Sequence, residues 1–226
     1  MGSHRNRPAA LAVAAALMSA APIGSGCQTP THASAPPTAP VASAPSTASQ
    51  QALLQGPWGR FRSVRFGLSI SLADGHSWMI DDRKTRWLSA RHPPSSSTLR
   101  ARSWYEPELM NRDKCRARAL QSITDMAAIK EGQLIDRRRL TDVPAADFDT
   151  ELWTAAAAQS TGNAVDGFAL AVGASLKRCV AIVFQTRAEG ANASSTVGER
   201  LAVAARMIEG TQLRSELQPQ DRVPLN

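Results

Sequence analysis

The sequence predicts an α+β fold, in which a mainly antiparallel sheet of about six to eight strands is covered by two helices. Short segments of alternating apolar and polar residues, joined by turn residues, predict the antiparallel strands. Two longer segments repeat apolar residues at helical spacing. The 226 residues are 43% hydrophobic and 20% charged, which is the balance of a folded domain rather than of a disordered chain.

The clearest strand pattern is the segment 64–72, whose apolar residues stand at every second position and predict one buried face. Asp74 and Gly75 then predict a turn. Shorter strands are expected at 78–80, 86–91 and 99–104. The proline- and serine-rich loop 92–97 predicts a hairpin connection between the last two.

The first helix is expected to begin after Pro107, because proline fits the first helical turn and Glu108 suits the partial positive charge there. It is expected to end around Asp125. One apolar stripe of this helix contains Cys115, Ala119, Ile123 and Met126.

Four further strands are expected at 134–140, 148–156, 165–174 and 178–186. The last contains an unbroken apolar run, which predicts a central strand covered on both faces. A final helix is expected from the helical spacing of Val197, Leu201, Ala204 and Ile208. Thr196 and Glu199 predict a capping box at its start, Gly210 predicts its end, and residues 211–226 are expected to trail along the surface.

The segment 66–72 reads Phe-Gly-Leu-Ser-Ile-Ser-Leu and is followed by Gly75 and Trp78. It resembles the opening of PsbP/Mog1-like domains, in which a Gly-aromatic strand leads into a Gly/Pro-Trp turn. The order of the predicted elements is also similar. The resemblance implies an α+β domain, and it transfers no binding residue to this chain.

Residues 1–26 are typical of a secretory signal peptide. His4, Arg5 and Arg7 form a basic start, the apolar segment 9–18 follows, and small residues come next. This segment is shorter than the roughly 20 residues that span a bilayer, so we expect it to be removed. The alternative is a buried N-terminal helix.

Cys27 follows Gly24, Ser25 and Gly26, and this ending resembles the lipobox of bacterial lipoproteins. In that family the cysteine thiol receives a diacylglycerol and becomes the new N-terminus. The sequence departs from the family at Gly24, where leucine is usual, and ordinary signal-peptidase cleavage stays an alternative. Gln28 in place of Asp resembles lipoproteins that are exported to an outer membrane.

The segment 28–50 has six Ala, five Pro, four Ser and four Thr among its 23 positions and no Asp, Glu, Lys or Arg. It predicts a tether between the lipidated Cys27 and a single domain at 51–226. As polyproline II it would reach roughly 70 Å, and as a flexible coil it would average about 27 Å. A tail without a spacing role is the alternative.

Cys115 and Cys179 fall in the first helix and the central strand, and export would place both where disulfides persist. The sequence therefore predicts a disulfide that closes a loop of about 65 residues and stabilises the domain by roughly 4 kcal/mol. A pair of buried free thiols is the alternative.

The domain at 51–226 holds all 19 acids and 24 of the 26 basic residues, which gives it a net charge of +5. Several arginines would form an anion-attracting face if they meet in space. The candidate anion-binding residues are Arg100, Arg102, Arg116, Arg118, Arg137, Arg138 and Arg139. Solvated positions paired with neighbouring acids are the alternative.

Catalytic and metal motifs are sparse. His76 stands near Asp74, Asp81 and Asp82, but their spacing matches no ligand motif, and a polar turn is the simpler interpretation. No serine lies in a Gly-x-Ser-x-Gly elbow.

The sequence therefore predicts a membrane-anchored exported lipoprotein with a non-catalytic binding or adaptor domain in the cell envelope. We expect it on the outer membrane, facing the periplasm or the surface. A structural or assembly lipoprotein and an envelope hydrolase are the alternatives. The expected partners are the lipid bilayer, through acylated Cys27, and an envelope protein or an anionic envelope surface. No cofactor and no nucleic acid are expected.

Overall fold

The structure, a computed structural model, describes residue 53 and residues 55–123, 133–160 and 162–213. The chain divides into two units, Met1–Ala42 and Ser43–Asn226, and every described residue lies in the second. The predicted signal peptide, Cys27 and the predicted tether lie outside the described residues, as do Asp125, Met126 and the tail 214–226.

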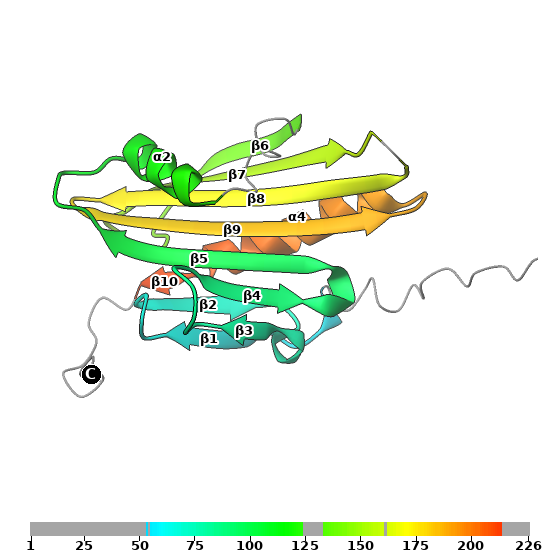
Figure 1. Cartoon of the computed structure of the whole chain (residues 1–226), viewed down its shortest axis with the longest axis horizontal. Coiled ribbons are helices and arrows are strands. Elements are labelled where there is room, and N and C mark those ends of the chain that lie inside the picture. Colours follow the sequence, from blue (N-terminus) through cyan, green and yellow to red (C-terminus); the bar gives the residue numbers. More distant parts are fainter. Residues whose placement is uncertain (1–52, 54, 124–132, 161, 214–226) are drawn as a thin grey trace, which may run out of the picture. The chain divides into compact units, whose positions relative to one another are not determined.

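Seven antiparallel strands form the larger sheet of the described part, in the order β3-β4-β5-β9-β8-β7-β6 (Figure 1). They are β3 (Met79–Asp81), β4 (Leu88–His92), β5 (Ser97–Tyr105), β6 (Gln133–Leu140), β7 (Asp149–Ala158), β8 (Ala164–Ser175) and β9 (Arg178–Glu189). The predicted strands at 78–80, 86–91, 99–104, 134–140, 148–156, 165–174 and 178–186 are confirmed within a few residues.

The two described α-helices, α2 (Arg112–Ser122) and α4 (Ala193–Glu209), cover opposite faces of this sheet (Figure 1). Strand β9 lies between β5 and β8, so its alternate side chains enter two different cores. Those that share a core with α4 are Val180, Ile182 and Phe184. Those that share a core with α2 are Cys179, Ala181 and Val183. The predicted α+β class and the two-sided burial of this strand are confirmed.

A second, three-stranded sheet consists of β1 (Gly59–Ser63), β2 (Leu68–Leu72) and β10 (Gln212–Leu213). Its apolar side chains Leu68, Ile70 and Leu72 belong to the core that contains α4. The expectation that 211–226 trails along the surface is therefore wrong for 211–213, where Thr211 is buried and β10 pairs with β2.

The prediction of a single strand over 64–72 is wrong, because the chain turns between Ser63 and Leu68. Gly67 has a positive φ of 60°, its N–H donates to Val64 O at 3.2 Å, and the Ser63 hydroxyl accepts from Phe66 N. A positive φ ends a strand, and glycine adopts it without strain. Val64 is consequently 46% exposed, although it continues the apolar alternation.

Both predicted helix starts are wrong. Helix α2 begins at Arg112 rather than after Pro107, because Asn111 Oδ1 accepts a hydrogen bond from Lys114 N and caps the helix there. Residues 106–111 form a loop instead. Helix α4 begins at Ala193, so Thr196 lies inside its first turn, where its N–H donates to Asn192 O.

Candidate functional site

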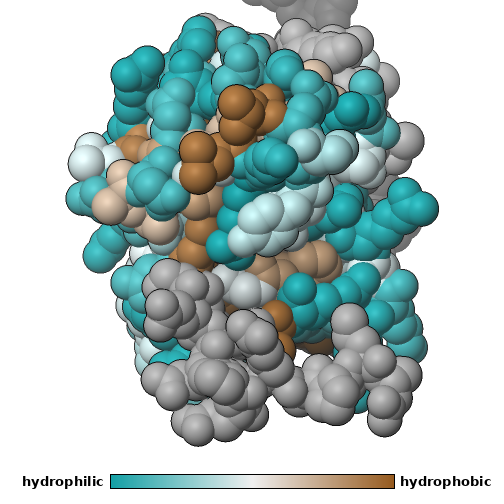
Figure 2. Space-filling model, turned by 90° about the vertical axis from the view of Figure 1, so that its left-hand side faces the viewer, coloured by the Kyte–Doolittle hydropathy of each residue, from teal (hydrophilic) through white to brown (hydrophobic). Residues whose placement is uncertain are grey.

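Three large apolar side chains are exposed at the end of the main sheet where β5 finishes and β9 begins. Tyr105 at the end of β5 is 72% exposed, Leu109 in the loop before α2 is 67% exposed, and Leu176 in the β8–β9 turn is 76% exposed. Figure 2 views this end, and apolar surface interrupts the polar surface in its middle. We call these three residues the apolar end patch.

Two backbone hydrogen bonds bring the patch together from two separate parts of the chain, the segment 105–110 and the β8–β9 turn. The N–H of Glu106 donates to Lys177 O at 2.8 Å, and the N–H of Met110 donates to Leu176 O at 2.7 Å. Tyr105 and Leu109 are the chain neighbours of these two donors. The loop 106–111 therefore runs alongside the β8–β9 turn.

Leu176 occupies an unusual backbone conformation for a leucine. It is the first residue of the two-residue turn between β8 and β9, and its φ is +50°. Asp74 and Asp142, which also have positive φ, belong to a residue type that often adopts it, whereas leucine pays roughly 1 kcal/mol or more. Glycine or asparagine is usual at such positions. An exposed leucine held there points to a role outside the folding of the domain.

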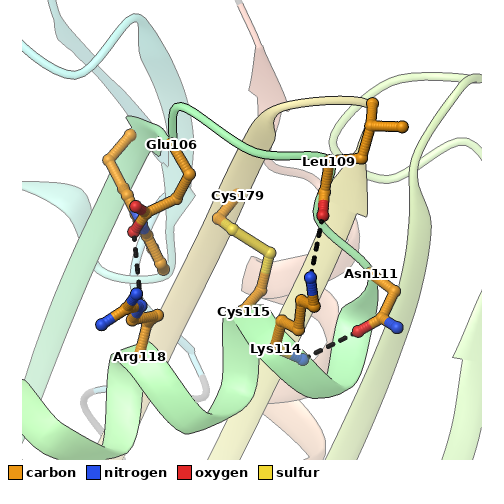
Figure 3. Close-up of a disulfide and its surroundings, with 8 residues drawn as sticks. Glu106, Leu109, Asn111, Lys114, Cys115, Arg118 and Cys179 are labelled. Carbon is orange, nitrogen blue, oxygen red and sulfur yellow. Dashed lines mark hydrogen bonds and ion pairs between the residues drawn. A yellow bond between two sulfur atoms is a disulfide. The ribbon is translucent and has the colours of Figure 1, made fainter.

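The loop 106–111 is fastened to α2 by polar contacts (Figure 3). Lys114 Nζ lies 2.6 Å from Glu108 Oε2 and donates to Leu109 O at 3.3 Å. Arg118 Nε lies 3.9 Å from Glu106 Oε1. Figure 3 shows the Leu109 side chain turned away from the helix, so these contacts hold the loop while leaving Leu109 outside.

A disulfide joins the helix that follows this loop to the central strand. The structure brings Cys115 of α2 and Cys179 of β9 to disulfide distance, as the sequence predicts, with their Cα atoms 5.6 Å apart and a separation of 64 in the sequence (Figure 3). Both cysteines are fully buried. Helix α2, and with it the loop 106–111, is thereby bound covalently to the central strand.

A pocket of about 420 Å³ opens beside the apolar end patch. It is lined by Tyr105, Ala145, Asp147, Phe148, Ser175, Leu176, Lys177, Arg178 and Leu213. Its volume falls within the range of pockets that hold small ligands. The guanidinium of Arg178 lies 5.2 Å from the centroid of the Tyr105 ring, and its Nε donates to Ser103 Oγ at 3.1 Å.

Two of the predicted anion-binding residues, Arg116 and Arg137, meet on one tryptophan. Their guanidiniums lie 4.5 Å and 4.9 Å from the centroid of the Trp153 ring. Arg137 Nε donates to Glu151 Oε1 at 2.8 Å, and Trp153 Nε1 donates to Glu151 Oε2 at 2.7 Å. Arg112 also approaches Glu151, with 3.7 Å between Nε and Oε2. This cluster joins α2 to β6 and β7, and its carboxylate neutralises part of its positive charge.

The remaining predicted arginines do not join this cluster. Arg100 and Arg102 lie on β5, opposite Val183 and Ala181, and so on the face that α2 covers. Burial lowers the pKa of Arg102. Arg138 lies on the other face, where its Nη2 is 2.6 Å from Glu209 of α4.

Arg118 and Arg139 complete the predicted set. Arg118 faces Glu106, as described above, and Arg139 lies opposite Glu151 in the β6–β7 register. Carboxylate partners are thus present for Arg116, Arg118, Arg137 and Arg138. Carboxylates of the domain therefore compensate much of the positive charge of these arginines.

A buried hydrogen-bond chain that sequence reasoning missed runs through His92. Its Nε2 lies 3.0 Å from Asp74 Oδ2 and its Nδ1 lies 2.7 Å from Ser95 Oγ. The chain continues through Ser97 to Thr186, which also accepts from Arg200. A hydrogen bond from Ser77, and then the histidine, lower the pKa of Asp74.

Asp74, His92 and Ser95 have the connectivity of a nucleophilic triad, but His92 and Ser95 have no exposed surface. A hydroxyl without access to solvent cannot attack a substrate, so the chain stabilises the contact between the two sheets. The local signal was the His-Pro-Pro-Ser sequence at the end of β4, where the side chain of His92 points inward together with Leu88 and Ala90.

The sequence-based alternative around His76 does not assemble into a cluster. Asp81 accepts hydrogen bonds from the N–H groups of Arg83 and Lys84, which lower its pKa. Asp82 accepts from Ser63, and burial raises its pKa. Within the described residues, no group of three or more His, Cys, Asp or Glu side chains is placed to hold a metal ion. None of the described helices combines the length and the apolar character needed to cross a membrane.

Comparison with known proteins does not place the chain in a family. No family model matches the sequence, and no curated protein matches it. A crystal structure from Bacteroides thetaiotaomicron VPI-5482 is similar over 73% of this chain and 50% of its own, with 12% identity and a TM-score of 0.42. The chain thus spans about half the length of that protein. A similarity at this level assigns no function, and the resemblance to PsbP/Mog1-like domains stays a prediction.

Removing the disulfide should destabilise the domain and loosen the loop 106–111. For the Cys115→Ser/Cys179→Ser variant we expect a loss of about 4 kcal/mol in unfolding free energy. Relative to the wild type, amide exchange should accelerate more at 106–111 than in β9. Urea unfolding and hydrogen exchange measure both effects. The reduced wild-type chain is the matched control and should resemble the variant. Two alkylatable thiols at Cys115 and Cys179 in the unreduced, unfolded chain would contradict the disulfide.

Glu151 should make the domain sensitive to acid. Burial raises the pKa of this carboxyl, but hydrogen bonds from Arg137 and Trp153 outweigh it, so the pKa lies below its usual 4.5. The unfolded chain therefore takes up the proton first, and the stabilisation is present above about pH 4.5 and is lost as pH falls through the folded-state pKa. Glu151→Gln should lose about 1–3 kcal/mol at pH 7 and show a smaller further loss in acid. Urea unfolding at several pH values tests this.

Glu189→Gln, which alters an exposed ion pair, is the control, and its unfolding free energy should depend on pH as in the wild type.

Proposed function

We propose that this chain is an exported lipoprotein whose domain is a non-catalytic binding or adaptor module, and that it docks onto another protein of the cell envelope through the apolar end patch. The observation that carries the docking role is the patch itself. Its three side chains, from two parts of the chain, each expose at least 67% of their surface. Tyrosine is enriched among the residues that dominate interface energies, and exposed apolar patches mark interaction sites.

Several contacts hold the patch in place, which favours binding. The two backbone hydrogen bonds, the contacts of Lys114 and Arg118, and the disulfide fix the loop 106–111 before any partner arrives. A preorganised surface loses little conformational entropy on association, so more of the contact energy appears as affinity. The strained backbone of Leu176 is consistent with the same role, because it adds an apolar contact at a cost to folding.

The membrane anchor rests on the sequence alone. Small residues before Cys27 support lipidation, and Ala, Pro, Ser and Thr in 28–50 support a tether. Two or more acyl chains at one cysteine hold a protein on a membrane stably, whereas one chain does so only marginally. The buried Ser95 hydroxyl and His92 ring weigh against the envelope hydrolase alternative.

Metabolic labelling tests the anchor. Cells that express the full chain with a palmitate analogue should label it and hold it in the membrane fraction. Cys27→Ser should remove the label and release the protein, because no thiol remains for the diacylglycerol. Cys115→Ser/Cys179→Ser is the control and should keep the label. An unlabelled wild-type chain that begins at Met1 would contradict the anchor.

Site-specific photo-cross-linking in intact cells tests the docking patch. A photoreactive amino acid at position 109 should yield one discrete adduct with an envelope protein, whereas the same residue at position 189, on the opposite end of β9, should yield none. Leu176→Gly in the same chain should reduce the adduct at least about tenfold, since it removes an anchor side chain. Glycine accepts a positive φ, so this variant should unfold within about 1 kcal/mol of the wild type. Equal adducts at 109 and 189, or an adduct that survives Leu176→Gly, would refute the patch.

A further inference from the structure

The pocket beside the apolar end patch has lining residues that the docking role does not use. Ala145, Phe148 and Leu213 are apolar and buried or half-buried, and Phe148 is only 7% exposed. Tyr105 and Leu176 add exposed side chains to the same lining. An apolar concavity of this size gains free energy by exchanging water for an aliphatic or aromatic group.

Two of the residues that line the same pocket are cations. Lys177 and Arg178 stand in succession where the β8–β9 turn enters β9. Lys177 is exposed and takes part in none of the ion pairs found among the described residues. Arg178 is held in place by Ser103 and lies on the Tyr105 ring.

The lining of the pocket contains one carboxylate, that of Asp147. Ser175 Oγ donates one hydrogen bond to Asp147 Oδ2. The pocket therefore presents two cations against one carboxylate, next to an apolar wall. A ligand complementary to this surface has an apolar body and one negative charge.

We propose that this pocket binds a single-chain anionic amphiphile, such as a free fatty acid. Its aliphatic chain lies against Phe148 and Leu213, and its carboxylate lies at Lys177 and Arg178. A charge-assisted contact from an ammonium or a guanidinium to a carboxylate orients the head group. This inference goes beyond the docking role, although Tyr105 and Leu176 contribute to both.

Tyr105 is the only tyrosine of the chain, so it provides a single reporter in the pocket wall. The full chain with Cys27→Ser, purified without detergent and labelled with 3-fluorotyrosine, is titrated with dodecanoate below its critical micelle concentration. Fluorine NMR should show one saturable shift. Dodecyltrimethylammonium has the same tail and the opposite charge, and it should bind at least about tenfold more weakly.

Charge variants locate the head group. Lys177→Glu should weaken dodecanoate binding at least about tenfold, and Lys177→Arg should stay within about twofold. Arg187→Glu changes the net charge by the same amount at the opposite end of β9, and it should also stay within about twofold. Equal binding of the two amphiphiles, or equal effects of Lys177→Glu and Arg187→Glu, would overturn the proposal.

Further measurements distinguish a monomeric ligand from a membrane surface, and distinguish the pocket proposal from the docking proposal. A shift with phosphatidylglycerol vesicles but not with monomeric dodecanoate would overturn the pocket ligand, because it would indicate contact with a membrane surface. Absence of dodecanoate binding with an intact cross-link at position 109 would remove the amphiphile and leave the docking role. Dodecanoate binding without that cross-link would support the pocket and remove the docking role.

Discussion

The link between α2 and the central strand β9 is the constraint on which the end of the domain with the apolar end patch depends. Cys179 belongs to the core beneath α2, and Cys115 joins it from the helix. Because α2 begins only at Arg112, the residues before it are free to form a loop. The disulfide fixes the helix that follows this loop from inside the core, and two backbone hydrogen bonds hold the loop itself to the β8–β9 turn.

The sequence predicts most of the fold because the strands repeat their side chains with a clear period. The unbroken apolar run of β9 identified a strand covered on both faces, and the structure confirms it. The turn at 64–67 was missed because Val64 and Phe66 continue the apolar alternation, while the left-handed Gly67 ends the strand. The start of α2 was missed because Pro107 and Asn111 both suit a helix start, and only the hydrogen bond to Lys114 distinguishes them.

The candidate site was much less predictable than the fold. The sequence indicated the cysteine pair, which lies next to the site. Leu176, however, is far from Tyr105 and Leu109 in the chain, and the three follow no common period. One local signal existed: a leucine and a lysine form the two-residue turn between β8 and β9, where glycine, asparagine or aspartate is usual. The arginine-rich segments attracted attention instead, yet several of their charges face carboxylates within the domain.

The contrast between paired and exposed charges separates the structural arginines of this domain from the lysine that we propose binds a ligand. Arg116 and Arg137 stack on Trp153, and Arg137 also binds the buried Glu151. Removing Arg137 would leave this desolvated carboxylate without one of its partners, at a large cost in stability. Lys177 carries its charge into solvent on a turn, next to an apolar wall. A folded domain gains little stability from such a lysine, whereas an anion that arrives with an apolar tail gains from the charge and from the wall together.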